Sequence, residues 1–189
     1  MPPADMAPMG YKGLLAKGQR GFVEMYMNIL SWRKGGITRV LKAVLEGKGG
    51  VLFHCNWGRD ETGIVAAILL LIAGAGTELV ELDWMLSRIG IEAVKAEWGW
   101  WVGRQLELPF TSQYPSRDWK HLRAYASLAN TEKDCWRAFL KRVEEEFEGG
   151  LVRGYVMCEL GFSGEQIWWM RKNLRGDVEK DKDEVEMEG

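Results

Sequence analysis

The segment from His54 to Gly63 combines a thiol, charged side chains and two glycines within ten residues. Cys55 can act as a nucleophile, and a nearby helix N-terminus would stabilise its thiolate. Before the loop, Gly50–His54 form a short apolar run that predicts a buried strand. After it, Ile64–Ala73 are apolar on every side and predict a buried helix. A strand, a glycine-containing loop and a helix N-terminus together form an arrangement that binds oxyanions such as phosphate.

At this loop the chain resembles the Cys-dependent protein tyrosine phosphatases, in particular the bacterial and fungal group whose loop is His-Cys-x-x-Gly-Lys-Asp-Arg-Thr-Gly. Arg59 stands where that group has lysine, and the identical residues are His54, Cys55, Gly58, Asp60, Thr62 and Gly63. Asp83–Ser87 is similar to the group's Asp-Tyr-x-Leu-Thr, and Leu160–Ser163 matches its Leu-Gly-Phe-Ser. The resemblance extends from about Tyr11 to Leu174.

The resemblance implies hydrolysis of phosphate monoesters through a cysteinyl-phosphate intermediate, with no metal or other cofactor. Cys55 would be the nucleophile, Asp60 the general acid and then base, and His54 would orient the loop and activate the thiol. The implied phosphate-binding loop consists of Asn56, Trp57, Gly58, Arg59, Glu61, Thr62 and Gly63. The substrate would be a phosphorylated protein or a phosphoinositide, and the sequence does not separate phosphotyrosine, phosphoserine and phosphoinositide.

Two features depart from the group's pattern. Glu61 replaces the arginine that ends the family's Cys-x5-Arg loop, and the chain has no Asn-Phe-Arg-Asp-type segment near its N-terminus. A planar guanidinium binds phosphoryl oxygens bidentately, so a carboxylate in its place inverts the local field. The repulsion costs about 4 kcal/mol at an effective dielectric constant of about 20, and the lost stabiliser about 3 kcal/mol more. The sum predicts a rate loss on the order of 10^5 unless another group compensates.

Several alternatives stay open at the sequence level. Arg59 could compensate for the missing arginine, or it could pair with Glu61. Cys55 and His54 could be ordinary buried residues, and the acids and Thr62 could serve only the start of a helix. The leading rival to an enzyme is a pseudophosphatase, which keeps the fold and loop but binds without turnover. A third possibility is an incomplete product of a decayed gene.

The predicted fold class is α/β: a mostly helical cysteine-phosphatase-like domain around a small sheet, with a helical C-terminal cap. Apolar spacing predicts helices over Gly21–Trp32, Ile37–Leu45 and Thr77–Arg88, the last with Leu79, Leu82, Trp84 and Leu86 apolar. A further helix is predicted to start at Asn130 or Thr131 and to run to about Phe147. The segment Ile91–Thr111 is rich in tryptophan and has no clean period, and it is interpreted as helical. Ser163 and Gln166 predict a capping box for a last helix to about Leu174. Residues 1–176 would form one N-terminally shortened domain.

Composition is that of one soluble domain, with 189 residues, 47% hydrophobic and 28% charged. The tail from Asp177 to Gly189 holds seven acidic residues and two lysines, and it is predicted to be disordered. The remaining 23 basic and 20 acidic residues give a net charge of +3, too mild to indicate nucleic-acid binding. The longest uncharged stretch, Thr62–Thr77, is shorter than the roughly 20 residues of a transmembrane helix, so a cytoplasmic protein is expected.

Residues outside the loop have less specific roles. The three cysteines lie far apart, which argues against a disulfide framework and a zinc site, and Cys135 and Cys158 are predicted to be core thiols. His121 is expected to be solvated. Trp98, Trp100 and Trp101 could pack in a core, in a partner interface or against lipid. Apolar surface left bare by the missing N-terminal part predicts self-association or a partner.

Overall fold

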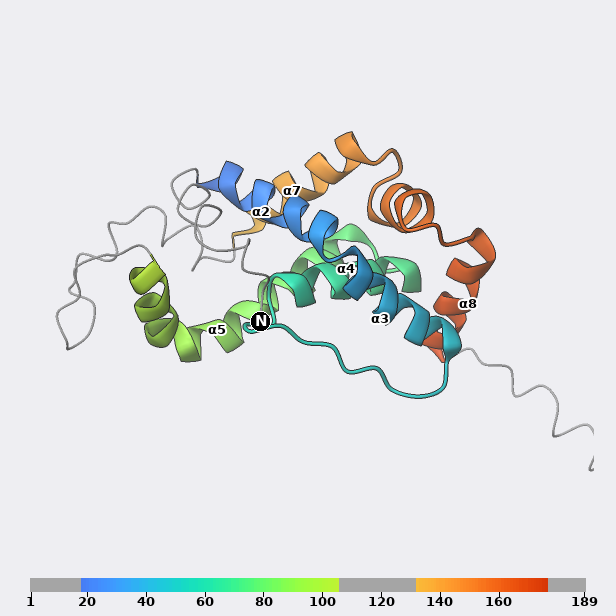
Figure 1. Ribbon diagram of the computed structural model, residues 1–189, viewed down its shortest axis with the longest axis horizontal. Coiled ribbons are helices and arrows are strands. Elements are labelled where there is room, and N and C mark those ends of the chain that lie inside the picture. The colour runs from blue at the N-terminus through green and yellow to red at the C-terminus, as the bar shows by residue number, and fades with distance from the viewer. Residues whose placement is uncertain (1–17, 106–131, 177–189) are drawn as a thin grey trace, which may run out of the picture.

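The computed structural model describes residues 18–105 and 132–176, and side chains of this part except those of residues 92–105 (Figure 1). Its secondary structure is helical throughout, with no β-strand in the described residues. In chain order the helices are α2 (Gln19–Trp32), α3 (Lys34–Glu46), α4 (Glu61–Ala73), α5 (Thr77–Gln105), α7 (Lys133–Glu146), the π-helix η3 (Leu151–Glu159) and α8 (Gly164–Arg175).

The predicted sheet is wrong. The apolar run before the loop is not a strand: it belongs to a long connection from α3 to α4 that runs along the outside of the helices (Figure 1). Leu52 in this run is 91% exposed. The physical reason is that a strand needs a partner for its backbone hydrogen bonds, and the described part of the chain provides none. The fold class over these residues is therefore all-helical.

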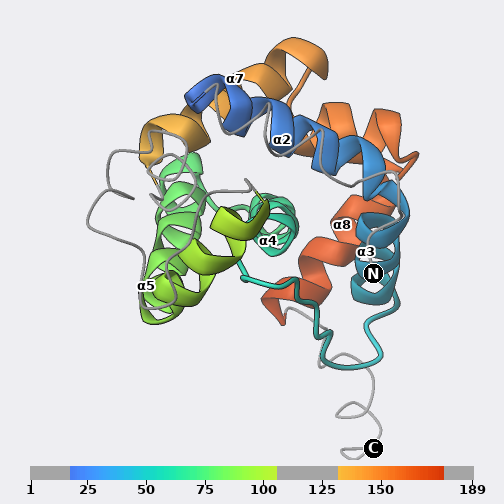
Figure 2. The same ribbon diagram turned by 60° about the vertical axis from the view of Figure 1, so that its left-hand side comes forward.

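The helix α4 lies at the centre of the molecule, with α5, α2, α3 and α8 around it (Figure 2). Its sequence contains no charged residue after Glu61, so every face can be buried. Ile64, Ile68 and Ile72 are fully buried. The prediction of a buried helix after the loop is confirmed, and this helix fixes the position of the loop that precedes it.

The two C-terminal helices belong to the core and do not cap a sheet, which corrects the predicted architecture. α7 packs against α2, and α8 packs against α3 and α4. The predicted capping box is confirmed, because the side chains of Ser163 and Gln166 each bond to the other's backbone. No pattern in the sequence indicates the π-helix η3. Its Gly154 lies so close to Phe147 that an added Cβ would stand 2.6 Å from that residue's carbonyl oxygen.

The predicted helix boundaries agree with the structure for α2, α3 and α7 to within a few residues. α5 is longer than the predicted Thr77–Arg88, because it continues through the tryptophan-rich segment to Gln105. Cys135 is buried as predicted, whereas Cys158 is exposed, so the prediction of a core thiol is wrong there. His121, the tail from residue 177 and the side chains of Trp98, Trp100 and Trp101 lie outside the described residues.

Candidate functional site

Two glycines lie where the loop enters α4, and each position requires glycine for a different physical reason. Gly58 has φ +68°, a left-handed conformation that glycine adopts without strain. Gly63 lies in the first turn of α4, where the indole of Trp84 packs directly on its backbone. A Cβ at Gly63 would stand 2.8 Å from Cδ1 of Trp84. The first glycine permits the turn, and the second permits close contact between α4 and α5.

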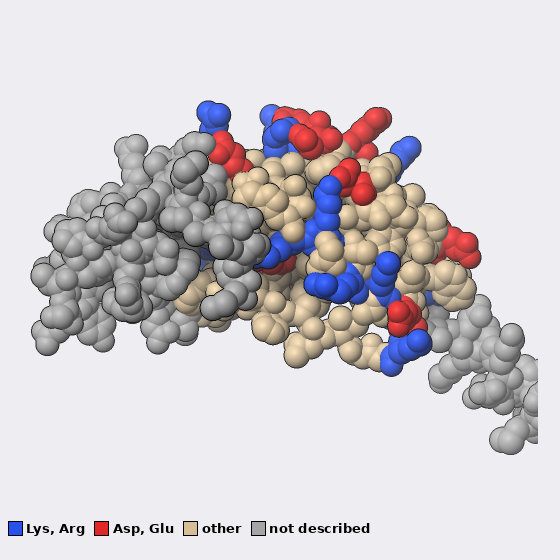
Figure 3. Space-filling view, viewed as in Figure 1, with Lys and Arg blue, Asp and Glu red and all other residues tan. Residues whose placement is uncertain are grey.

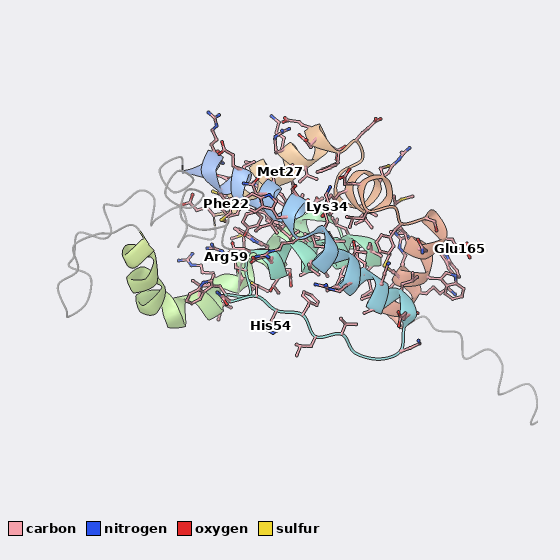
Figure 4. The ribbon with its side chains drawn as sticks, in the orientation of Figure 1. Phe22, Met27, Lys34, His54, Arg59 and Glu165 are labelled. Carbon is pink, nitrogen blue, oxygen red and sulfur yellow. The ribbon has the colours of Figure 1, made fainter. Side chains whose placement is uncertain are left out.

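Arg59 is the most unusual residue of the site, because its charged side chain is only 2% exposed. Its Nε donates to Oδ1 of Asp60 at 2.9 Å, and its Nη2 to Oδ2 at 3.5 Å. The same Oδ1 accepts a hydrogen bond of 2.7 Å from the hydroxyl of Tyr26. In Figure 4 Arg59 lies among the side chains of the interior, whereas His54 lies on the outer loop. The guanidinium therefore points into the protein and not over the loop.

The surroundings of this ion pair are aromatic. Nε1 of Trp84 donates to the hydroxyl of Tyr26 at 3.1 Å. The ring of Tyr26 stacks on Phe22 with centroids 4.1 Å apart, and Trp84 stacks on Trp136 at 5.1 Å. Three helices, α2, α5 and α7, thus supply the rings that surround the loop's last residues.

Burial and charge shift the pKa values of this network. Burial lowers the pKa of Arg59, but the charge of Asp60, together with the hydrogen bonds and other interactions with Asp60 and Tyr26, outweighs this effect, so the pKa lies above its ordinary value. Burial, followed by the charge of Asp60, raises the pKa of Tyr26 well above its usual value. Arg59 therefore stays charged and Tyr26 stays a neutral donor at physiological pH.

Glu61 occupies the first position of α4, where an acidic side chain is favoured by the helix dipole. Its Oε1 lies 3.7 Å from Nη2 of Arg33, the residue between α2 and α3. Both side chains are 37% exposed, so the pair is accessible to water. Neither sequence-level alternative for Arg59 describes this arrangement, since Arg59 bonds to Asp60 and Glu61 pairs with a different arginine.

The other predicted site residues surround the start of α4 without bonding to one another. Cys55 is half-buried, and His54 and Asn56 are exposed; none of them hydrogen-bonds to any residue that the structure describes. Thr62 Oγ1 is buried and has no hydrogen-bond partner there either. Trp57 is half-buried and packs against the hydrophobic core. The roles that the resemblance gives to these residues stay predictions.

Three residues of the site were missed at the sequence level: Tyr26, Trp84 and Arg33. Tyr26 lies within the predicted helix Gly21–Trp32, and Trp84 is both an apolar residue of the predicted helix Thr77–Arg88 and part of the segment similar to Asp-Tyr-x-Leu-Thr. Neither residue was predicted to contact the loop. The signal that was available is the Asp-Tyr-x-Leu-Thr similarity, which places an aromatic residue at Trp84. Nothing in the sequence indicates that Arg33, 28 positions before Glu61, lies beside it.

In the described residues a partly buried cysteine is followed by a glycine turn and by the N-terminus of a central apolar helix, an arrangement that can hold an anion such as phosphate. A family model described as the tyrosine phosphatase family matches residues 5–176. The chain belongs to the tyrosine phosphatase family. No curated protein matches it. In the described residues no helix is both long and apolar enough to cross a membrane.

Proposed function

We propose that this chain is a pseudophosphatase: a tyrosine phosphatase family member in which hydrolysis through Cys55 is reduced to background and whose role is binding. The observation that carries the proposal is the buried ion pair of Arg59 and Asp60. It turns the loop's own guanidinium into the interior and engages the carboxylate that would serve as the general acid. Ligands that fit the loop's chemistry are phosphorylated proteins and phosphoinositides.

The charge at Glu61 supports the proposal. A phosphate dianion at the N-terminus of α4 would meet a carboxylate where the family pattern has an arginine. The repulsion lies between about 1 kcal/mol in water and about 4 kcal/mol at an effective dielectric constant of about 20, and 37% exposure favours the lower half. Loss of one strong anion stabiliser adds about 3 kcal/mol. The expected rate loss is therefore on the order of 10^3 to 10^4.

The contacts of Asp60 add a second obstacle. A general acid must give its proton to the leaving oxygen of the substrate. The Asp60 carboxylate instead accepts hydrogen bonds from Arg59 and from Tyr26. Both donors stabilise the ionised carboxylate, so the protonated form that a general acid needs is disfavoured, and substrates with poor leaving groups are expected to lose the most rate.

The proposal is tested by hydrolysis of p-nitrophenyl phosphate and of an alkyl phosphate by the native protein and by Cys55→Ser. Equal rates for native protein and variant, with both substrates, are expected of a pseudophosphatase. Native hydrolysis that Cys55→Ser abolishes would contradict the proposal.

Slow hydrolysis is the second candidate function, and the position of Arg33 favours it. Its guanidinium lies 3.7 Å from the Glu61 carboxylate and is half-exposed, so it could turn toward a phosphoryl group at the helix start. If this candidate is correct, native hydrolysis exceeds that of Cys55→Ser, and Arg33→Ala lowers it to the same background.

A further inference from the structure

The helix α5 carries an apolar stripe on its solvent side, which we call the α5 seam and define by Leu79, Leu82, Leu86 and Ile89. These side chains are 53%, 52%, 52% and 72% exposed. Their spacing of three, four and three residues is that of the a and d positions of a coiled coil. Such a row of large apolar side chains indicates an interaction surface.

The opposite side of α5 already faces the core. Val80, Trp84 and Ile91 are buried, and at 100° per residue they point about 160° away from the seam. In Figure 2 α5 lies at one edge of the molecule, with α4 on its inner side. The seam is therefore not needed to hold α5 in the fold, and these leucines are available for a second helix.

The charged residues beside the α5 seam limit which kind of second helix could pack on it. Glu78 and Asp83 are exposed and occupy the g and e positions that flank the seam. In a parallel dimer of two copies, Glu78 would face Asp83 of the second copy, and in an antiparallel dimer the two Asp83 side chains would meet near the two-fold axis. Both pairings are repulsive, so a second copy is disfavoured.

We infer that the α5 seam binds an amphipathic helix of another protein whose apolar stripe is flanked by basic residues. Apolar packing would supply the contact area, and the basic flanks would pair with Glu78 and Asp83 and exclude acidic helices. The seam lies on α5, away from the helix start that carries the loop. The inference therefore stands whether or not Cys55 hydrolyses phosphate, and it names a partner class for the binding role proposed above.

The test uses two labelled peptides of about three heptads, both with leucine at a and d, one with lysine and the other with glutamate at e and g. Fluorescence anisotropy with the full-length native protein should show the lysine peptide binding at least about tenfold more tightly. The double variant Leu82→Asn/Leu86→Asn should weaken that binding by about tenfold or more. Leu52→Asn, at an exposed leucine outside α5, is the matched control and should leave it unchanged.

The charge-reversal variant Asp83→Lys keeps the seam intact and should shift the preference toward the glutamate peptide, so the test does not depend on the double variant folding. Equal affinity for both peptides, an unchanged preference in Asp83→Lys, or the same loss in Leu52→Asn would overturn the inference. Sedimentation of the native protein as a dimer that Leu82→Asn/Leu86→Asn dissociates would overturn it in favour of a second copy.

Discussion

At the scale of single residues, the orientation of Arg59 separates this loop from one that could hold phosphate with its own guanidinium. The side chain is charged, buried and bonded to Asp60, while the adjacent Glu61 reaches outward to Arg33. An interior charge is stable only when it is paired, so the ion pair and the rings around it form one unit. Arg59 and Asp60 of the loop therefore help to hold the start of α4 against α2 and α5.

Removing the Arg59 side chain is expected to destabilise the protein strongly. Arg59→Ala leaves Asp60 and Tyr26 without their charged partner and should lower the free energy of unfolding by about 3 kcal/mol. Urea unfolding measures this change. The matched control is Arg20→Ala, since the Arg20–Glu24 pair is exposed and contributes about 0.5 kcal/mol or less. Equal effects of the two substitutions would show that Arg59 is not held as described.

The thiols of Cys135 and Cys158 should differ in reactivity. Burial, and then the charges of Glu132 and Asp134, raise the pKa of Cys135 to about 11, so almost no thiolate forms at pH 8. Iodoacetamide at this pH should modify Cys158, which is exposed, and leave Cys135 unmodified until the protein is unfolded in urea. Mass spectrometry of native and unfolded samples measures the labelling. Labelling of Cys135 in the native protein at the rate of Cys158 would contradict its burial.

For the candidate site, the sequence indicated which residues form the loop but not how their side chains are arranged. The cysteine loop, its two glycines and the missing arginine were all recognisable from residue types and spacing. The inward direction of Arg59 was not, because it depends on Tyr26 and Trp84, which come from helices before and after the loop. No local pattern reports which side chains distant helices bring to one point.

At the scale of elements, close contact between α4 and α5 depends on a glycine. Gly63→Ala would place a Cβ 2.8 Å from Trp84, whose indole cannot move without losing its bond to Tyr26. A loss of about 1–3 kcal/mol in urea unfolding is expected. Gly35→Ala in α3 is the control, since no atom lies within 4 Å of its added Cβ, and it should stabilise by about 0.5–1 kcal/mol. A stabilising Gly63→Ala would contradict the packing of Trp84.

Helices were predictable where apolar residues recur at helical spacing. The sequence could not show that the predicted strand does not form. Val51–Phe53 has strand-like composition, but composition does not supply the neighbouring strand that a sheet requires. In α5 the same limit applies: Leu79, Leu82 and Leu86 were grouped with Trp84 as apolar residues of one helix, although only Trp84 is buried. Hydrophobic spacing identifies the helix but not which of two apolar sides the core uses.

At the scale of the whole molecule, several exposed ion pairs and the α5 seam lie on different helices. In Figure 3 charged side chains occur over the centre and the lower right of the face shown, and others line its upper edge, where α2 and α7 lie. Exposed ion pairs there include Arg20–Glu24 and Arg142–Glu146. The exposed leucines and isoleucine of α5 lie on a different helix. The α5 seam is therefore a surface of its own, on a helix other than those that carry these ion pairs.

The central claim is that Cys55 does not turn over phosphate esters, because the loop's guanidinium is held in the buried Arg59–Asp60 ion pair and Glu61 places a carboxylate where the family pattern has arginine. The most direct measurement is hydrolysis of p-nitrophenyl phosphate, whose good leaving group needs little help from Asp60, by native protein, Cys55→Ser, Glu61→Gln and Glu61→Arg. Native protein should match Cys55→Ser, Glu61→Arg should exceed it at least about 100-fold, and Glu61→Gln should fall between them. Circular dichroism verifies the fold of each variant. A folded Glu61→Arg variant with no gain, or native activity already well above Cys55→Ser, would contradict the claim.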